Sequence, residues 1–339
     1  MKWVVFCDVI VTRLQARAGK LSGYSQTVQK TLERFTSYRN LSNADVRDVS
    51  NEDFDGYIRR RQQDKWKGDT ISRRTINNEI DILNMALGKA GPTERRGAGR
   101  RNLGLVAMPP YFDSLDGDDP SPVFCTEDQI SAFFAAACHA TTPRLEGCSP
   151  ETFWRAAVLL DGITLLRRGS LLLIERPSDH DLTVKKQLQL PAEFNKTRRN
   201  KTVSLGSRQD LVDLFASLPS RAGEPLLPWR SPAGKALSLS HFTKTVAQIQ
   251  RDAGIPDATR MRIKDLRSTG ATLVGDGAGT AIAKRMLGHA PGTTTFERHY
   301  QARLLPPEEV AATDSLADRL MTLMQRPRPA TLLKLAAAQ

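Results

Sequence analysis

The chain of 339 residues is poor in the residues that build disulfide frameworks, metal clusters and membrane spans. It has four cysteines without a Cys-x-x-Cys pair, and its five histidines lack ligand spacing, so we expect neither a disulfide scaffold nor a zinc site. No apolar run approaches the length of about 20 residues that spans a bilayer. Asp8 interrupts the apolar stretch at residues 4–11, which argues against a signal peptide or an anchor. We therefore expect a cytoplasmic protein with no membrane partner.

Acidic side chains are also in deficit, because 37 Asp and Glu stand against 49 Lys and Arg, for a net charge of +12. The first third holds most of the excess, with 20 basic and 12 acidic residues in positions 1–112. Such a balance favours a polyanionic partner, usually nucleic acid, although a basic soluble protein without one has the same composition. The content of 40% hydrophobic and 25% charged residues is ordinary for globular proteins. At roughly 100–200 residues per domain, the length predicts two domains.

Residues 1–90 predict a small bundle of helices. Helical spacing of apolar residues, preceded by capping residues, places helices over residues 8–18, 25–38 and 53–65 and from a cap at Thr70 or Ser72 to residue 89. Two arginine clusters, one of them the run 59–61, are expected to face outward. The candidate DNA-binding residues in them are Arg59, Arg60, Arg73 and Arg74.

Residues 91–122 interrupt the helical pattern with Gly and Pro pairs and with a basic, glycine-rich run. We interpret them as a basic linker whose Arg100 and Arg101 contact a phosphate backbone; a soluble tether is the alternative.

Residues 123–325 predict a second, mainly helical domain, followed by a tail at 326–339. Alternating apolar residues within 182–205 predict one small antiparallel sheet, and Arg198 and Arg199 at its polar tip are candidate DNA contacts. The expected helices span residues 126–137, 150–166, 208–217, 240–253, 262–274, 280–287 and 306–324. The fold class is therefore mainly α with a small antiparallel β-sheet.

One tyrosine and several separated basic residues could carry chemistry in this second domain. Of five tyrosines, Tyr300 alone lies there. Two arginines suit the non-bridging oxygens of a phosphodiester, a lysine on a hairpin can protonate a leaving oxygen, and a tyrosine can attack phosphorus. The candidate catalytic residues, in chain order, are Arg167, Lys196, Lys264, Arg267, His289 and Tyr300.

This order of motifs resembles the tyrosine recombinase, or phage integrase, family. Leu-Leu-Arg167-Arg-Gly-Ser resembles the first arginine box of the family, and Phe-Asn-Lys196-Thr resembles its lysine-bearing hairpin. Lys264-Asp-Leu-Arg267-Ser resembles the second box, and Leu-Gly-His289 resembles the third. The resemblance covers about residues 5–305 of the sequence.

The resemblance implies a core-binding, SAM-like helical domain followed by a DNA breaking-rejoining catalytic domain. Arg167 and Arg267 would then bind the scissile phosphate, Lys196 would act as general acid, and Tyr300 would form a 3′-phosphotyrosine. Two further residues, Lys264 and His289, would assist proton transfer or contact the phosphate. The family needs no metal or other cofactor, because cationic side chains supply the charge stabilisation that a metal would give.

The implied function is site-specific DNA recombination or integration. The partners would be double-stranded recombination sites, bound by a homotetramer on two duplexes, and an accessory DNA-bending protein is left open. We expect a cytoplasmic protein associated with the nucleoid. The helix at 306–324 is expected to dock on a neighbouring protomer.

Three alternatives remain open. A type IB topoisomerase-like enzyme would share the phosphotyrosine chemistry and relax supercoils without partner sites. A catalytically impaired DNA-binding protein of the same fold would fit Ser170, which stands where the family usually has an acidic residue, and the long step from His289 to Tyr300. A basic RNA-binding protein is the least favoured, since no aromatic-rich RNA-recognition motif is present.

Overall fold

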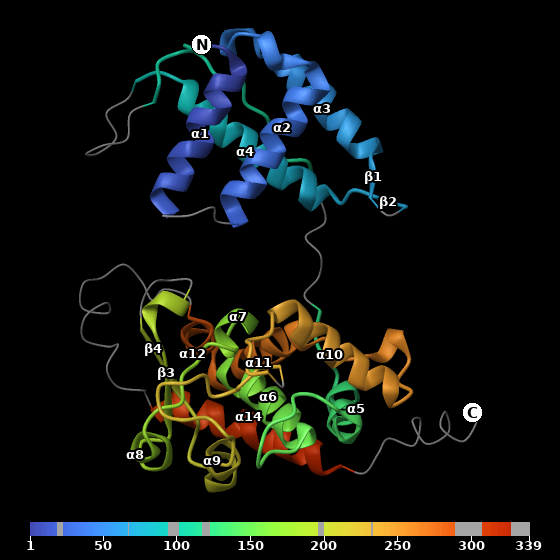
Figure 1. The fold of residues 1–339 in the computed structure, drawn as a ribbon, viewed down its shortest axis with the longest axis vertical. Coiled ribbons are helices and arrows are strands. Elements are labelled where there is room, and N and C mark those ends of the chain that lie inside the picture. Colours follow the sequence, from blue (N-terminus) through green and yellow to red (C-terminus); the bar gives the residue numbers. More distant parts are fainter. Residues whose placement is uncertain are drawn as a thin grey trace. The chain divides into compact units, whose positions relative to one another are not determined.

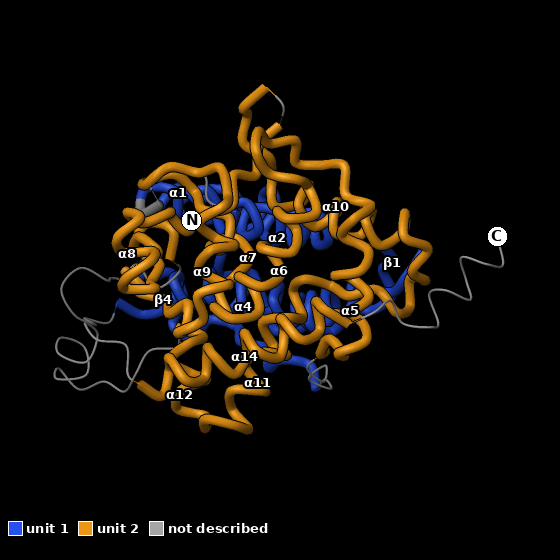
Figure 2. Tube along the Cα trace, turned by 90° about the horizontal axis from the view of Figure 1, so that it is seen from below, with its two compact units in different colours: residues 1–120 blue, residues 121–339 orange. Residues whose placement is uncertain are grey.

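The computed structural model describes residues 1–18, 23–66, 68–93, 102–116, 123–195, 200–231, 233–288 and 307–326. The chain divides into two compact units, Met1–Pro120 and Ser121–Gln339, which have separate colours in Figure 2. Within the described ranges, helices dominate both units, and each unit contains one two-stranded antiparallel sheet. The mainly α fold class is therefore confirmed, although the sequence predicted only the sheet of the second unit.

Unit 1 is a helical bundle (Figure 1), and two of its helices begin at side-chain caps. At one helix start, the Ser50 hydroxyl accepts a hydrogen bond from the backbone amide of Asp53, and the Asp53 carboxylate accepts one from the backbone amide of Ser50. At the next long helix, the Ser72 hydroxyl accepts a hydrogen bond from the backbone amide of Thr75. Of the two residues that the sequence predicts for this second cap, Thr70 and Ser72, the structure uses Ser72. The helices are α1 (Trp3–Ala18), α2 (Gly23–Arg39), α3 (Asn51–Gln63) and α4 (Arg73–Ala90).

Aromatic side chains fill the core of unit 1. Trp3, Phe6, Phe35 and Phe54 are completely buried, and Tyr57 is nearly so. The ring of Phe35 lies 5.3 Å from those of Phe54 and Tyr57 and 5.6 Å from that of Trp3. Helix α1 starts earlier than the sequence predicted because Trp3 and Phe6 extend its apolar face into this core.

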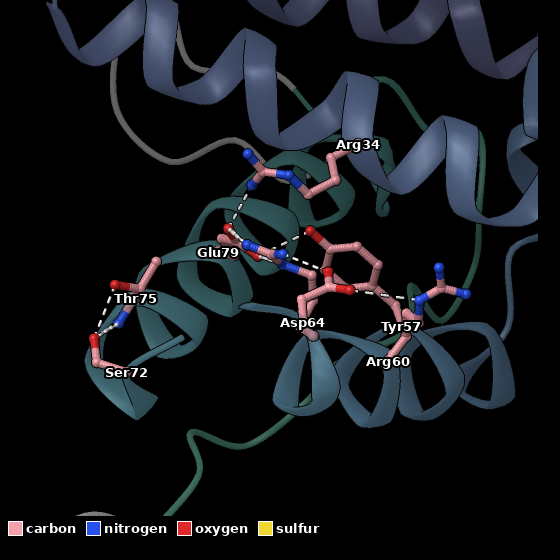
Figure 3. Close-up of polar contacts among 8 residues, drawn as sticks. Arg34, Tyr57, Arg60, Asp64, Ser72, Thr75 and Glu79 are labelled. Atoms are coloured by element: carbon pink, nitrogen blue, oxygen red, sulfur yellow. Dashed lines mark hydrogen bonds and ion pairs between the residues drawn. The ribbon is translucent and has the colours of Figure 1, made fainter. Parts of the chain in front are cut away.

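One residue of the arginine run 59–61 lies inside unit 1. Arg61 on α3 is 6% exposed, and its guanidinium donates to both carboxylate oxygens of Glu79 on α4, at 2.8 and 2.9 Å. Glu79 also accepts hydrogen bonds from the Tyr57 hydroxyl and from Arg34 on α2 (Figure 3). The prediction that this whole run faces outward is therefore wrong, because a buried carboxylate from another helix lies opposite Arg61.

A short hairpin joins α3 to α4 (Figure 1). Strand β1 (Lys65–Trp66) pairs with β2 (Asp69–Thr70), with Lys65 opposite Thr70 and Trp66 opposite Asp69. Strands of this length leave no alternating pattern in a sequence, which explains why the hairpin was not predicted.

Part of the expected linker at 91–122 is packed structure. Asn84 of α4 exchanges two hydrogen bonds with the backbone of Phe112, and Asn77 does the same with Leu115. Phe112 and Leu115 pack against the core of unit 1, so residues 102–116 belong to that unit. The side-chain amides of Asn77 and Asn84 thus satisfy backbone groups of this segment that a neighbouring β-strand would otherwise bind. Arg100 and Arg101 lie outside the described residues.

Unit 2 is built around helix α6, in which every residue from 156 to 164 is buried (Figure 1). A helix that is buried on all sides belongs inside a domain, and α6 packs against α11, α14 and the turn Ala137–His139 that follows α5. The described helices of this unit are α5 (Glu127–Ala136), α6 (Pro150–Thr164), α7 (Arg168–Leu171), α8 (Asp179–Thr183), α9 (Gln209–Ala216), α10 (Leu239–Asp252), α11 (Ile263–Ala278), α12 (Thr280–Met286) and α14 (Pro307–Gln325).

The sheet of unit 2 consists of β3 (Gln187–Leu190) and β4 (Lys201–Ser204), paired antiparallel with Leu190 opposite Lys201. The predicted alternation began earlier, at residues 182–184, but these residues form and follow helix α8. Ser178 caps that helix through the Asp181 amide, and local capping decides the structure there.

Helix α14 packs on α5, α6 and α11 of its own unit, burying Leu316, Ala317 and Leu320. The expected docking of this helix on a neighbouring protomer is therefore not the arrangement in this structure. Across the described ranges, every helix is too short or too polar to traverse a lipid bilayer.

Candidate active site

Arg167 occupies the junction between α6 and α7. Helix α6 ends at Thr164, and Leu165 adopts a left-handed conformation with φ 50°. Arg167 is extended and precedes the first turn of α7. Its neighbour Arg168 is half-buried and donates to the Thr243 hydroxyl at 3.2 Å.

Arg267, on the second turn of α11, connects this junction with the end of α12. One Nη donates to the carbonyl of Leu165, and the other donates to the carbonyl of Leu287 at 2.8 Å. Burial and the nearby positive charge of Arg167 lower the pKa of Arg267 to about 10. No carboxylate of the described residues forms an ion pair with Arg167 or Arg267. The two guanidinium groups thus form a positive centre that no ion pair with a described carboxylate neutralises.

Lys201, the first residue of β4, completes the cationic cluster. Its ammonium group donates to the carbonyl of Met286, at the end of α12. Burial lowers the pKa of Lys201 to about 8, and the charges of Arg267 and Arg167 act in the same direction, while Glu309 opposes them. This lysine can therefore lose or donate a proton near neutral pH. The sequence argument chose Lys196 from the same hairpin, and Lys196 lies outside the described residues.

Asp161 lies beneath the cluster on α6 and is completely buried. Neither of its carboxylate oxygens has a hydrogen-bond partner among the described residues. Burial raises the pKa of Asp161 to about 8, against the opposing influence of Arg267 and Arg168. Asp161 was not among the residues predicted for the site, although a single Asp directly after the apolar run 156–160 was the available signal.

Both flanks of the segment 289–306 adjoin the cluster. A Cβ placed on Gly288 would lie 3.8 Å from the Lys201 ammonium nitrogen. On the other flank, Glu309 on α14 binds Arg285 of α12 at 2.9 Å and acts electrostatically on Lys201. The predicted site residues His289 and Tyr300 lie within that segment, outside the described residues.

Two other predicted features of the site are described. Lys264 is exposed one helical turn before Arg267, and the structure assigns it no contact with the cluster. Ser170, at the position where the recombinase family usually has an acidic residue, is buried and donates to the carbonyl of Phe194 at 3.1 Å. Ser170 thereby ties α7 to the start of the loop between β3 and β4.

The four described candidates for DNA binding lie on unit 1 and are exposed. Arg59 and Arg60 lie in the C-terminal half of α3, and Arg60 forms an ion pair with Asp64 at 3.5 Å (Figure 3). Arg73 and Arg74 begin α4, so the hairpin β1–β2 lies between the two pairs along the chain. Arg198 and Arg199 lie outside the described residues.

Comparison with known proteins links this chain to others through its fold. No protein-family model and no curated protein sequence matches it. Among solved structures, a lambda integrase dimer bound to a COC′ core site matches with a TM-score of 0.59 and 16% identity, over 86% of this chain and 96% of that one. The Tn1549 transposon integrase in complex with circular intermediate DNA matches with a TM-score of 0.56 and 16% identity, over 91% and 98%.

A third match is the XerH site-specific recombinase bound to its difH substrate, with a TM-score of 0.53 and 13% identity, over 88% of this chain and 83% of that one. These alignments extend across most of both units. The resemblance to the tyrosine recombinases that the motifs indicated is thus confirmed in three dimensions: the chain has the fold of these integrases and recombinases.

Proposed function

We propose that this protein is a site-specific DNA recombinase that cleaves and rejoins duplex DNA through a 3′-phosphotyrosine. The observation that carries the proposal is the convergence of Arg167, Arg267 and Lys201 from three distant segments of a chain with the recombinase fold. A cationic centre without a carboxylate partner among the described residues is suited to a phosphodiester.

In the proposed reaction, the Tyr300 hydroxyl gives its proton to His289, to which the family resemblance assigns an assisting role, and its oxygen forms a bond to phosphorus while the bond from phosphorus to the 5′-oxygen breaks. Arg167 and Arg267 hold the non-bridging oxygens and stabilise the negative charge of the five-coordinate transition state. Lys201 gives a proton to the leaving 5′-oxygen, which its lowered pKa permits near neutral pH. Rejoining reverses these steps. Lys264 and His289 retain the assisting roles that the family resemblance implies.

The positions of the residues on either side of the segment 289–306 support Tyr300 as the nucleophile. Gly288 and Glu309, on either side of the segment, both lie close to Lys201. At no more than about 3.6 Å per residue, the twelve-residue step from Gly288 is long enough to bring the Tyr300 hydroxyl to the arginines.

The test is covalent trapping on nicked duplexes of randomised sequence, in which the broken strand cannot be rejoined. We expect the full chain to form adducts that survive denaturation, Tyr300→Phe to form none, and Tyr111→Phe, altered in unit 1, to match the original chain. Adducts that persist in Tyr300→Phe would exclude the proposed nucleophile.

A substrate with sulfur at the 5′-bridging position distinguishes which of the two hairpin lysines, Lys196 or Lys201, is the general acid. A thiolate leaves without receiving a proton, so this substrate should restore cleavage in a variant that lacks the general acid. We expect restoration in Lys201→Met. Restoration in Lys196→Met, with Lys201→Met remaining inactive, would assign the role to Lys196 as the motif implies.

A DNA-binding protein without strand cleavage is the second candidate function. Ser170 favours it, since a buried hydroxyl bonded to the Phe194 carbonyl cannot supply the negative charge of the usual acidic residue. Retained duplex binding with no adduct from any nicked substrate would establish this alternative.

The proposed partners are double-stranded recombination sites, bound by a homotetramer that joins two duplexes. The lambda integrase tetramer solved on a Holliday junction supports this assembly. We place the protein at the nucleoid in the cytoplasm, and an accessory DNA-bending protein would be a further component of the proposed complex.

A further inference from the structure

Trp66 is exposed to an unusual degree for a tryptophan. It is 71% exposed, whereas Trp3 and Trp154 are completely buried and Trp229 is 4% exposed, and all four lie in the described part of the chain. Large aromatic side chains are mostly buried in folded proteins, and those outside are enriched at binding surfaces. The surroundings of Trp66 indicate which kind of surface it forms.

The hairpin that carries Trp66 has a fixed base. The amide of Ile71 donates to the carbonyl of Asp64 at 3.2 Å, and Gly68 makes the turn with φ 95°. The Asp64 carboxylate accepts a hydrogen bond from Arg61 at 2.6 Å, and Arg61 is held by the buried Glu79. The ion-pair network between α3 and α4 therefore presents the hairpin in a defined orientation, which lowers the entropic cost of binding.

Positively charged residues flank Trp66 along the chain. Residues 59–74 include seven Lys or Arg and two Asp. Arg61 is neutralised by Glu79, and Asp64 is occupied by Arg60 and Arg61. The exposed cations of this segment that the structure describes are Arg59, Arg60, Lys65, Arg73 and Arg74.

We propose that the hairpin β1–β2 is a duplex-DNA contact of unit 1, in which Trp66 packs against the DNA and the surrounding cations bind phosphates. The proposal rests on the proposed function for the nature of the partner. Cations at this density favour a polyanion through release of its counterions, and an aromatic ring adds contact with sugars or bases. A second copy of the chain is disfavoured, because a symmetric contact through Trp66 would bring two identical basic patches together.

The first test uses tryptophan fluorescence of the full chain with a mixed-sequence duplex at low salt. Acrylamide reaches exposed indoles, so Trp66 should dominate the quenching of the free protein. We expect the duplex to reduce this quenching several-fold, and we expect the Trp66→Phe variant to show no such change.

The second test measures duplex affinity. Trp66→Ala should weaken binding by about fivefold to tenfold, the lower part of the range for loss of an aromatic contact with a base. Because no charge is removed, the salt dependence of binding should stay the same, whereas Lys65→Gln should reduce its slope by about 0.9. Trp66→Phe should retain binding within about twofold, and Tyr111→Ala, at another exposed aromatic residue of unit 1, should bind as the original chain does.

The outcomes separate this inference from the proposed function. Duplex binding with unchanged Trp66 quenching and unchanged affinity of Trp66→Ala overturns the inference and leaves the recombinase proposal intact. Absence of duplex binding by the original chain at low salt overturns both. Protection of Trp66 by increasing protein concentration without DNA assigns the hairpin to self-association and overturns the DNA contact.

Discussion

Replacing Asp161 with Asn should make unit 2 less sensitive to pH. Asp161 is completely buried, its oxygens lack hydrogen-bond partners among the described residues, and its pKa is raised to about 8. In the unfolded chain the same carboxyl has a pKa near 3.8. Between these two values the folded protein holds a proton that the unfolded protein releases. Asp161 therefore favours folding most at acidic pH, and that contribution is lost as pH rises toward 8.

The size of the effect follows from one proton. With one more proton bound in the folded state, the free energy of unfolding falls by about 1.4 kcal/mol for each pH unit within this window. Asn has nearly the same shape and does not titrate. As the pH rises by about two units, the free energy of unfolding of Asp161→Asn should therefore increase by nearly 3 kcal/mol relative to that of the original chain.

Urea unfolding at several pH values from about 5 to 7.5 measures this difference. This pH range excludes most of the titration of Lys201. Because burial lowers the pKa of Lys201 to about 8, its charge destabilises the fold by a constant amount below that pH, and this cost decreases only above it. A constant difference between the two proteins would refute the reasoning, since it would mean that Asp161 is ionised and paired with Arg267 at all these pH values.

Three further predictions concern single residues. Glu79→Gln should destabilise unit 1 by about 3–5 kcal/mol in denaturant unfolding, because the buried Arg61 charge loses its partner; a loss below about 1 kcal/mol would contradict a buried pair. Ser72→Ala should cost about 1 kcal/mol by removing the cap of α4, and an unchanged unfolding midpoint would contradict the cap. Cleavage should decline above about pH 8 as Lys201 loses its proton, and Lys196→Met should preserve that decline; a decline that disappears in Lys196→Met assigns it to the other lysine.

Local signals in the sequence were sufficient for the long helices. Helix α4 has a regular apolar face and a cap at Ser72, and both are determined by residues close together in the chain. Helix α6 was predicted from its apolar run, but its end was placed too late. The left-handed turn at Leu165 depends on contacts made there with Arg267, about a hundred residues later in the chain.

Side-chain environments depended on distant partners. Arg61 resembled its exposed neighbours until Glu79 was placed opposite it. The motif order indicated Arg167 and Arg267, and the structure brings them together. The motif order also indicated Lys196, which lies outside the described residues, whereas the position of Lys201 depends on the carbonyl of Met286 on α12, 85 residues later in the chain. Lys264, also predicted for the site, is exposed and has no assigned contact with the cluster.

The central claim is that the cationic cluster of unit 2 exposes a DNA phosphate to attack by the Tyr300 oxygen. The most direct measurement is mass spectrometry of the protease- and nuclease-digested covalent adduct, which identifies the residue that bears the nucleotide. The account predicts a peptide with the 3′-phosphate of DNA on Tyr300, formed by the original chain and lost in Arg167→Ala and Arg267→Ala. A nucleotide attached to any other residue, or an adduct that forms equally well without both arginines, would contradict it.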